Sequence, residues 1–151
     1  MLKIKKMTYP ILYSFKRCPY AMRARMALNL AKIKTEIREV RLNNKPKHML
    51  KVSPKGTVPI LVLDDEVIDE SNDIIKWVMN RKNIFQKDLD SYTKNLTEDL
   101  ITIFDDKFKY HLDRYKYSTR YENVDIEFHR LECLKISVSY THLRAHETEP
   151  D

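Results

Sequence analysis

A cysteine followed by a proline stands where an apolar run gives way to a helical pattern. Pro19 suits the first position of a helix, because its fixed φ matches helical backbone and its missing N–H would be unpaired there. Cys18 is then the capping residue, where free N–H groups and the positive end of the helix dipole favour a thiolate over a thiol. The neighbouring cations Lys16 and Arg17 act in the same direction. This arrangement predicts that Cys18 is a nucleophile, although a buried structural cysteine is the common alternative for a free thiol.

The cysteine has no partner at the spacing that dithiol redox sites use. The third residue after Cys18 is Ala21, whereas a dithiol site would carry a second cysteine there. A mixed disulfide formed at Cys18 must therefore be released by a thiol from outside the chain. The sequence thus predicts a monothiol site that works with glutathione or a similar small thiol.

The composition of the 151-residue chain narrows the class of protein. The net charge of +6 comes from scattered lysines rather than from a basic face with interleaved aromatics, so nucleic acid is not an expected partner. The single glycine, Gly56, excludes the glycine-rich loops that bind nucleotides. No apolar run approaches the ~20 residues that span a bilayer. The two cysteines, Cys18 and Cys133, form no disulfide framework, so we expect a cytoplasmic protein without a membrane partner.

Strand and helix patterns alternate through the first half of the chain. Residues 11–15 are typical of a buried strand, and residues 21–32 follow as a helix. The apolar positions of this helix are Met22, Met26, Ala27 and Leu30. Residues 35–42 alternate between polar and apolar, which predicts an edge strand. Because it follows a crossover helix, we expect this strand to lie parallel to the first. The remaining elements are a short helix, a hairpin and a longer helix, over residues 46–52, 58–69 and 70–81. We expect an α/β domain of order βαβαββα over residues 1–81.

The second half of the chain is helical in character. An apolar stripe with charges opposite predicts a helix from Asp88 to about Tyr115. A second helix is expected from Asn123 through Cys133. Together they predict a partial all-helical domain over residues 88–135, with an exposed apolar stripe that would need a partner surface.

The last segment, residues 136–151, fits neither half of the chain. It has no apolar period, so we expect it to be disordered, and it resembles the translated adapter sequence found at the ends of truncated gene predictions. His142 and His146 are spaced as two metal ligands on a helix could be. No third ligand accompanies them, so no metal site is predicted.

Four short motifs stand in a fixed order on these predicted elements. They are Cys18-Pro19-Tyr20-Ala21, Asn44-Lys45-Pro46, Gly56-Thr57-Val58-Pro59 and Glu70-Ser71. In this order and strand context they resemble the thioredoxin-like N-terminal domain of glutathione S-transferases. The closest likeness is to the cysteine-type classes, omega-like and glutaredoxin-like. The family usually continues with five or more helices and forms homodimers, whereas this chain has room for about two helices, so the second-substrate site and the dimer are in question.

The resemblance implies roles for the residues at the centre of the site. Cys18 would be the catalytic thiol and Pro59 a cis-proline beside it, which turns the main chain of Val58 toward the cysteinyl part of glutathione. An ordinary trans proline at a strand start is the alternative for Pro59.

The resemblance also assigns the residues that would hold the two ends of glutathione. Ser71, as the N-cap of its helix, would bind the γ-glutamyl carboxylate, and Glu70 would face the amino group. Lys45 would lie near the glycyl carboxylate. A plain N-cap remains the alternative for Ser71 and a solvated loop residue the alternative for Lys45. Arg17, Tyr20 and Lys55 are second-tier candidates.

The function that this resemblance implies is a glutathione-dependent thiol transferase or reductase that acts on a small disulfide. Conjugation of glutathione to an electrophile is a second possibility, but it needs an activating hydroxyl, for which Tyr13 and Ser14 are the nearby candidates. A third is a non-catalytic relative of the stringent-starvation type, which binds protein partners. A fragment that does not fold stably alone is a fourth.

Overall fold

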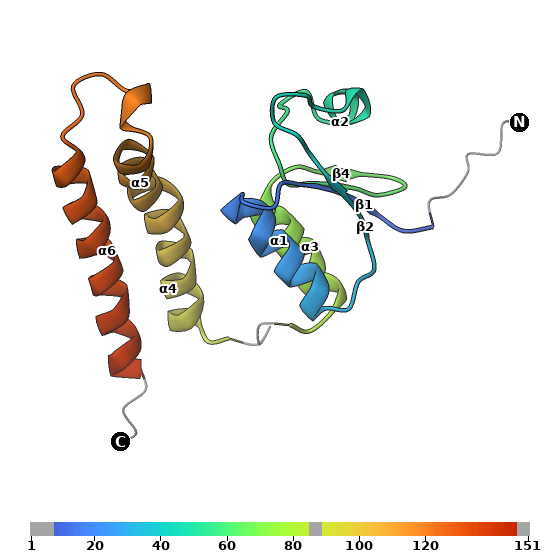
Figure 1. Ribbon diagram of the computed structural model, residues 1–151. Coiled ribbons are helices and arrows are strands. Elements are labelled where there is room, and N and C mark those ends of the chain that lie inside the picture. The colour runs from blue at the N-terminus through green and yellow to red at the C-terminus, as the bar shows by residue number, and fades with distance from the viewer. Residues whose placement is uncertain (1–7, 85–88, 148–151) are drawn as a thin grey trace, which may run out of the picture. The chain divides into compact units, whose positions relative to one another are not determined.

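The computed structural model describes residues 8–84 and 89–147, with side chains described as far as Tyr140 (Figure 1). The chain divides into two compact units, Met1–Lys87 and Asp88–Asp151. The first unit mixes strands and helices, and the second is helical. Within the described ranges, no helix combines the length and the apolar character needed to cross a membrane.

The first unit has the predicted order of elements. In chain order these are β1 (Ile11–Ser14), α1 (Pro19–Leu30), β2 (Glu36–Glu39), α2 (Lys47–Val52), β3 (Ile60–Val62), β4 (Val67–Ile68) and α3 (Ser71–Arg81). The order βαβαββα is therefore confirmed.

The four strands form one mixed sheet in the order β2-β1-β3-β4. The strand β2 lies at an edge, as its alternating pattern predicts, and runs parallel to β1, as expected after a crossover helix. The strand β3 runs antiparallel to β1, with Tyr13 opposite Ile60, and forms the predicted hairpin with β4. Because of this register, the residues that follow β1 and those that precede β3 meet at the same end of the sheet.

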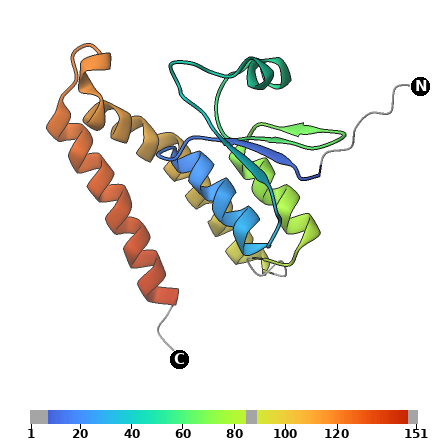
Figure 2. The same ribbon diagram turned by 45° about the vertical axis from the view of Figure 1, so that its right-hand side comes forward.

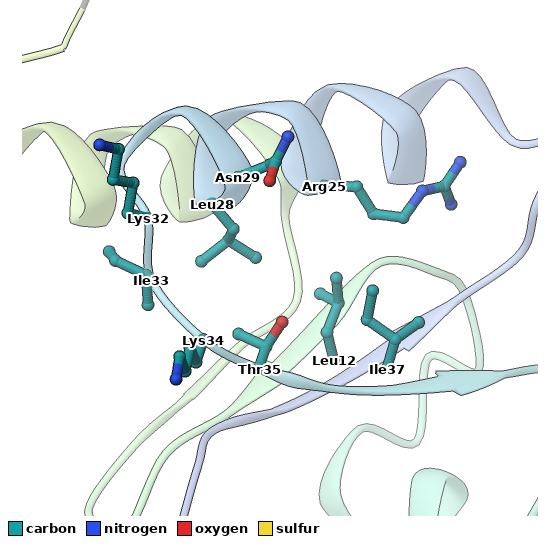
Figure 3. Close-up of a pocket in the computed structure, with 9 residues that line it drawn as sticks. All are labelled: Leu12, Arg25, Leu28, Asn29, Lys32, Ile33, Lys34, Thr35 and Ile37. Carbon is teal, nitrogen blue, oxygen red and sulfur yellow. The ribbon is translucent and has the colours of Figure 1, made fainter.

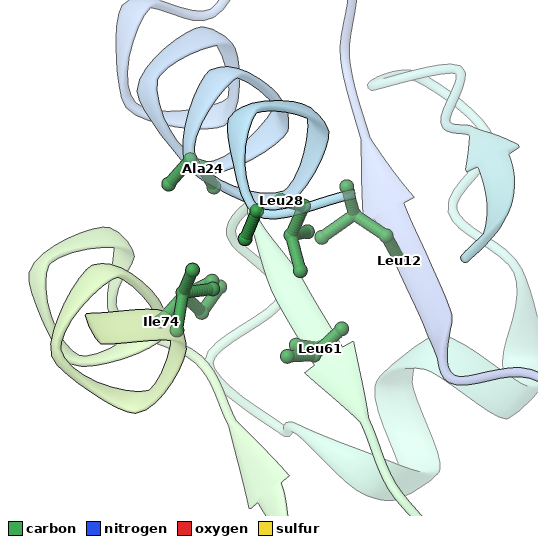
Figure 4. Close-up of a cluster of buried hydrophobic side chains, with 8 residues drawn as sticks. Leu12, Ala24, Leu28, Leu61 and Ile74 are labelled. Atoms are coloured by element: carbon green, nitrogen blue, oxygen red, sulfur yellow. The ribbon is translucent and has the colours of Figure 1, made fainter. Parts of the chain in front are cut away.

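Alternation along the strands divides the core between the two faces of the sheet. Leu12 and Leu61 point to the face that α1 and α3 cover, where they pack with Leu28 and Ile74 (Figure 4). Their neighbours along β1 and β3 point to the other face, beneath α2. That second cluster consists of Ile11, Tyr13, Val40, Met49, Ile60 and Val62. The two central strands, β1 and β3, are thus buried on both faces, and β1 leads directly to Cys18.

The buried face of α1 differs from the predicted one. Met22, Met26 and Leu30 are exposed, whereas the buried residues are Ala21, Ala24, Ala27 and Leu28. The buried residues recur at three and four positions, so they too form one helical stripe. The small side chains of the three alanines let α1 lie close to the sheet and to α3. A search for bulky apolar residues overlooks such a face.

The second unit is a helical hairpin with one irregular turn. Its first arm consists of α4 (Ser91–Thr102), a π-helical segment (Ile103–Phe108) and α5 (Lys109–Lys116). This arm matches the single helix predicted from residue 88 to about residue 115. Asp90 caps α4, since its carboxylate accepts a hydrogen bond of 2.7 Å from the backbone N–H of Thr93. That bond also lowers the pKa of the Asp90 carboxyl below its usual value.

The second arm, α6 (Ile126–Glu147), is longer than predicted. It runs antiparallel to the first arm (Figure 2), because residues later in α6 contact residues earlier in the first arm. The thiol of Cys133 points to the carbonyl oxygen of Phe108 at 3.9 Å, and the rings of Phe104 and Tyr140 are 5.8 Å apart. The helix thus continues past Cys133 into residues 136–147, which belong to the segment that the sequence predicts to be disordered. Residues 148–151 and the side chains of His142 and His146 lie outside the description.

The hairpin contains a pair of histidines whose surroundings predict a dependence of stability on pH. The Nδ1 atoms of His111 and His129 are 2.8 Å apart, and His129 is buried. Burial lowers the pKa of His129 below 6.5, and the nearby charges of His111 and Arg114 lower it further, against the weaker opposite effect of Asp125 and Glu132. In the unfolded chain this pKa returns to about 6.5.

The free energy of unfolding should therefore fall as the pH drops below about 6.5. In that range the unfolded chain binds a proton that folded His129 does not bind. Urea titrations followed by far-UV circular dichroism at pH 7.5 and pH 5.5 measure the effect. In His129→Gln the free energy of unfolding should differ less between the two pH values. If this variant loses as much stability between pH 7.5 and pH 5.5 as the parent chain, the effect belongs to other groups.

Candidate active site at the start of helix α1

The thiol of Cys18 lies at the junction of β1 and α1. Cys18 is the N-cap of α1 with extended backbone, φ −82° and ψ 118°, and Pro19 follows in the first turn. Its backbone N–H donates to the carbonyl oxygen of Phe15 at 3.0 Å. The side chain makes no capping hydrogen bond to the helix, so capping does not occupy the sulfur. The predicted placement of Cys18 at the positive end of a helix is confirmed.

The peptide bond between Val58 and Pro59 is cis, as predicted. Pro59 is buried directly before β3, and Val58 is half-buried. The Sγ atom of Cys18 lies 3.7 Å from the carbonyl oxygen of Val58. The structure therefore brings Cys18, Val58 and Pro59 together, although forty positions separate the cysteine from Val58.

Ser71 is the first residue of α3 and not its N-cap as predicted. Glu70 occupies the cap position with extended backbone, φ −116° and ψ 134°. The hydroxyl of Ser71 is buried and accepts a hydrogen bond of 2.9 Å from Nε of Arg23 in α1. The sequence could not reveal this arrangement, because the partner of the hydroxyl comes from a helix 48 positions earlier.

Two side-chain contacts join the loop before Pro59 to the start of α3. Lys55 forms an ion pair with Glu70, and the hydroxyl of Ser53 donates to the carboxylate of Asp69 at 2.6 Å. Ser53 is buried, so its bond to Asp69 is shielded from water. These contacts place Lys55 and Glu70, both candidates from the sequence, side by side at the N-terminal end of α3.

Lys45 passes over the one glycine of the chain. A Cβ added to Gly56 would lie 3.5 Å from Nζ of Lys45 and 3.2 Å from Cδ2 of Leu50. Gly56 has a φ of +64°, a conformation that side chains disfavour. The glycine thus provides both the turn and the room that the lysine uses.

Gly56→Ala should lower the free energy of unfolding by about 1–2 kcal/mol, the cost of left-handed backbone for a residue with a Cβ. Gly56→Asn is the matched variant, because asparagine tolerates this conformation better, and it should lose less. Urea denaturation of the three proteins measures both values. Equal losses in the two variants would attribute the effect to crowding by Leu50 and Lys45.

The two aromatic contacts beside the site involve arginines. The guanidinium carbon of Arg17 lies 5.7 Å from the ring centre of Phe15, and that of Arg23 lies 4.9 Å from the ring centre of Tyr20. Arg17 is exposed and Tyr20 is half-buried. Two of the three second-tier candidates, Arg17 and Tyr20, therefore flank Cys18 in the chain, and Arg23 contacts both Tyr20 and Ser71 of α3.

Cys133 has the opposite character from Cys18. It is buried in the helical unit, and burial raises the pKa of its thiol. A thiol held in the protonated form is a poor nucleophile, so Cys133 has the features of a structural cysteine.

A cavity of about 370 Å³ lies between α1 and β2, apart from the candidate residues (Figure 3). It has an apolar floor that includes Leu12, Leu28 and Ile37, and Lys32 and Lys34 lie at its rim. None of the site residues predicted from the sequence lines it. Over the described residues, no cluster of three or more histidines, cysteines or acidic residues could hold a metal ion.

The sequence analysis did not identify two arginines of α1 that contact residues of the site. Arg23 holds Ser71, and Arg25 contacts the segment before Cys18. In the sequence both appear as charges on a helix, and a charge on a helix is usually a solvated side chain. Their partners are fixed only by the packing of α1 against the sheet and α3.

Comparison with known proteins agrees with this geometry. Residues 12–84 match the family model described as glutathione S-transferase, N-terminal domain. "Glutathione S-transferase DHAR3, chloroplastic" of Arabidopsis thaliana is 29% identical over 65 residues, which are 43% of this chain and 25% of that protein. A protein of Aplysia californica named "Probable glutathione transferase" is 37% identical over 54 residues, 36% of this chain and 59% of that protein.

A solved structure extends the likeness in fold beyond the matched sequence. Glutathione transferase Omega 3C from Trametes versicolor superposes with a TM-score of 0.74 at 19% identity, over 86% of this chain and 59% of that one. This chain thus spans only part of the length of each of these relatives. Residues 12–84 thus resemble the N-terminal domain of glutathione S-transferases, and the first unit has a thioredoxin-like fold.

Proposed function

We propose that the protein is a glutathione-dependent thiol transferase of the cysteine type, with Cys18 as its nucleophile. The observation that carries the proposal is the thiol at the N-terminus of α1, 3.7 Å from the carbonyl oxygen of Val58 before cis-Pro59. The names of the Arabidopsis and Aplysia relatives, which describe glutathione transferases, support glutathione as the co-substrate.

The reaction takes two thiol–disulfide exchanges. The Cys18 thiolate attacks the glutathione sulfur of a mixed disulfide, so that a disulfide between Cys18 and glutathione forms and the substrate leaves as a thiolate that takes up a proton. The thiolate of a second glutathione then attacks that disulfide. Glutathione disulfide leaves, and the Cys18 thiolate is restored. Glutathione is the reductant, so the residue at position 21 need not be a cysteine.

The residues around Cys18 would hold glutathione in an extended form. The main chain of Val58 pairs with the cysteinyl part, and the start of α3 with Ser71 receives the γ-glutamyl carboxylate. Glu70 faces the amino group while its other contact, Lys55, balances its charge. Lys45 reaches the glycyl carboxylate from its place over Gly56.

The hydroxyls near the site support cysteine chemistry over conjugation to electrophiles. The hydroxyl of Tyr13 is buried and lies 2.7 Å from Nδ1 of His48 and 3.2 Å from Nη1 of Arg38. The hydroxyl of Ser14 is buried and bonded to Arg25. Neither is free to activate the glutathione thiol, whereas Cys18 is half-exposed.

The test is reduction of a small glutathione mixed disulfide by the purified protein, followed by the appearance of glutathione disulfide. Turnover that depends on glutathione and on protein concentration is expected. Retention on immobilised glutathione, measured in parallel, separates binding from chemistry. A folded protein that binds glutathione without turnover would refute the enzyme and support the binding-protein alternative.

A further inference from the structure

The guanidinium of Arg25 binds the three residues that lead into the cysteine. Its Nη1 atom donates to Oγ of Ser14 at 2.5 Å and to the carbonyl oxygen of Phe15 at 3.3 Å, and its Nη2 atom donates to the carbonyl oxygen of Lys16 at 3.1 Å. In Figure 3 this guanidinium points away from the lysines of the neighbouring cavity. One side chain of α1 thus folds back on the turn that comes before its own helix.

The same turn is held by two further hydrogen bonds. The carbonyl oxygen of Phe15, which accepts from Arg25, also accepts from the backbone N–H of Cys18 at 3.0 Å. On the other side, the backbone N–H of Lys16 donates to the carboxylate of Glu39 at the end of β2, at 2.8 Å. The turn is therefore fixed between α1 and β2, and its last residue is Cys18.

The geometry requires an arginine in particular. A planar guanidinium presents several N–H groups in a fixed fork, so it reaches a hydroxyl and two carbonyl oxygens at once. A lysine at this position keeps the charge but offers a single nitrogen on a flexible stem. Removing the fork would leave the buried hydroxyl of Ser14 without this donor and free the carbonyl of Lys16.

We propose that Arg25 is a positioning residue for Cys18. By holding the turn, it keeps the thiol at the N-terminus of α1 and beside the carbonyl oxygen of Val58. The effect on turnover rests on the proposed function, but the effect on the thiol does not. The two can therefore be measured apart.

The experiment compares Arg25→Lys and Arg25→Gln with the parent chain, all in a Cys133→Ser background so that Cys18 is the one thiol. Alkylation by iodoacetamide is timed from pH 5 to pH 9, and turnover with a glutathione mixed disulfide is measured in the same samples. Lys34→Gln is the matched control, because Lys34 is an exposed cation that contacts none of residues 14–16 in the described hydrogen bonds.

In both Arg25 variants alkylation at neutral pH should slow by up to about tenfold, because the thiol no longer keeps its place at the start of α1. The limiting rate at high pH should change little, which excludes altered access. Turnover should fall through kcat more than through KM. Arg25→Lys removes the planar guanidinium but keeps the positive charge. Its alkylation profile should therefore change less than that of Arg25→Gln.

Urea denaturation identifies the conditions in which each variant is folded, and the profile is compared under those conditions only. A folded Arg25→Lys and a folded Arg25→Gln with the parent profile would overturn the proposal, whatever their stability. If the profiles of the Arg25 variants change while the parent chain shows no turnover, the positioning role is retained and the thiol transferase is refuted.

Discussion

Cys18→Ser should reduce glutathione-dependent turnover of a mixed disulfide to the rate of free glutathione alone. A serine hydroxyl can occupy the same place at the start of α1, but oxygen cannot take the place of sulfur in a disulfide. The loss is therefore expected to be complete, without a change in fold. Intact-mass measurement after incubation with glutathione disulfide should show one glutathione on the parent chain and none on the variant.

Cys133→Ser supplies the matched control for the loss of a thiol. Its sulfur is buried against the carbonyl oxygen of Phe108, and burial favours its protonated form. This variant should keep its turnover and still take up one glutathione. Turnover that survives in Cys18→Ser, or glutathione found on Cys133, would refute the assignment of the nucleophile.

Ile74→Ala should cost about 2–5 kcal/mol of the free energy of unfolding. Ile74 is fully buried in the cluster where α3 meets α1 and the sheet (Figure 4). The substitution removes three heavy atoms from a site surrounded by Leu12, Leu28 and Leu61, which are fixed on three other elements. Such a site collapses poorly around a cavity. Urea denaturation followed by the fluorescence of Trp77, in the same helix, measures the loss.

Leu30→Ala is the control for the loss of a large aliphatic side chain. Leu30 is 55% exposed at the end of α1, and alanine is the best helix former. The free energy of unfolding of this variant should stay within about 0.5 kcal/mol of that of the parent chain. A loss comparable to that of Ile74→Ala would mean that α1 buries the face with Leu30, contrary to the alanine face described above.

The site centre was predictable because each of its features has a local cause. The proline after Cys18 starts a helix, the apolar run before it forms a strand, and the loop before Pro59 carries the only glycine of the chain. The hairpin and the edge strand follow from turn residues and from alternation. These patterns span a few residues, so they can be recognised without knowledge of the rest of the fold.

The remaining features depend on packing between distant segments. Ser71 accepts a hydrogen bond from Arg23, which only the packing of α3 against α1 allows. Three alanines and Leu28, rather than the methionines, face the core from α1 because space there is limited by the sheet and by α3. The continuation of α6 past Cys133 depends on contacts with the first arm, such as that between Phe104 and Tyr140. None of these partners is close in sequence.

The antiparallel register of β1 and β3 also determines where the chain can change its length. Tyr13 is opposite Ile60, and the next pairs along the strands are Leu12 with Leu61 and Ile11 with Val62. One residue inserted between Gly56 and Ile60 would either shift these pairs and turn every side chain of β3 to the wrong face, or displace Val58 from the thiol. The turn at Asp64 and Asp65 joins β3 to β4 at the opposite end of the strand and has no such constraint. Natural variants of this domain should therefore gain and lose residues at the hairpin turn, and keep a constant length between the glycine and the strand.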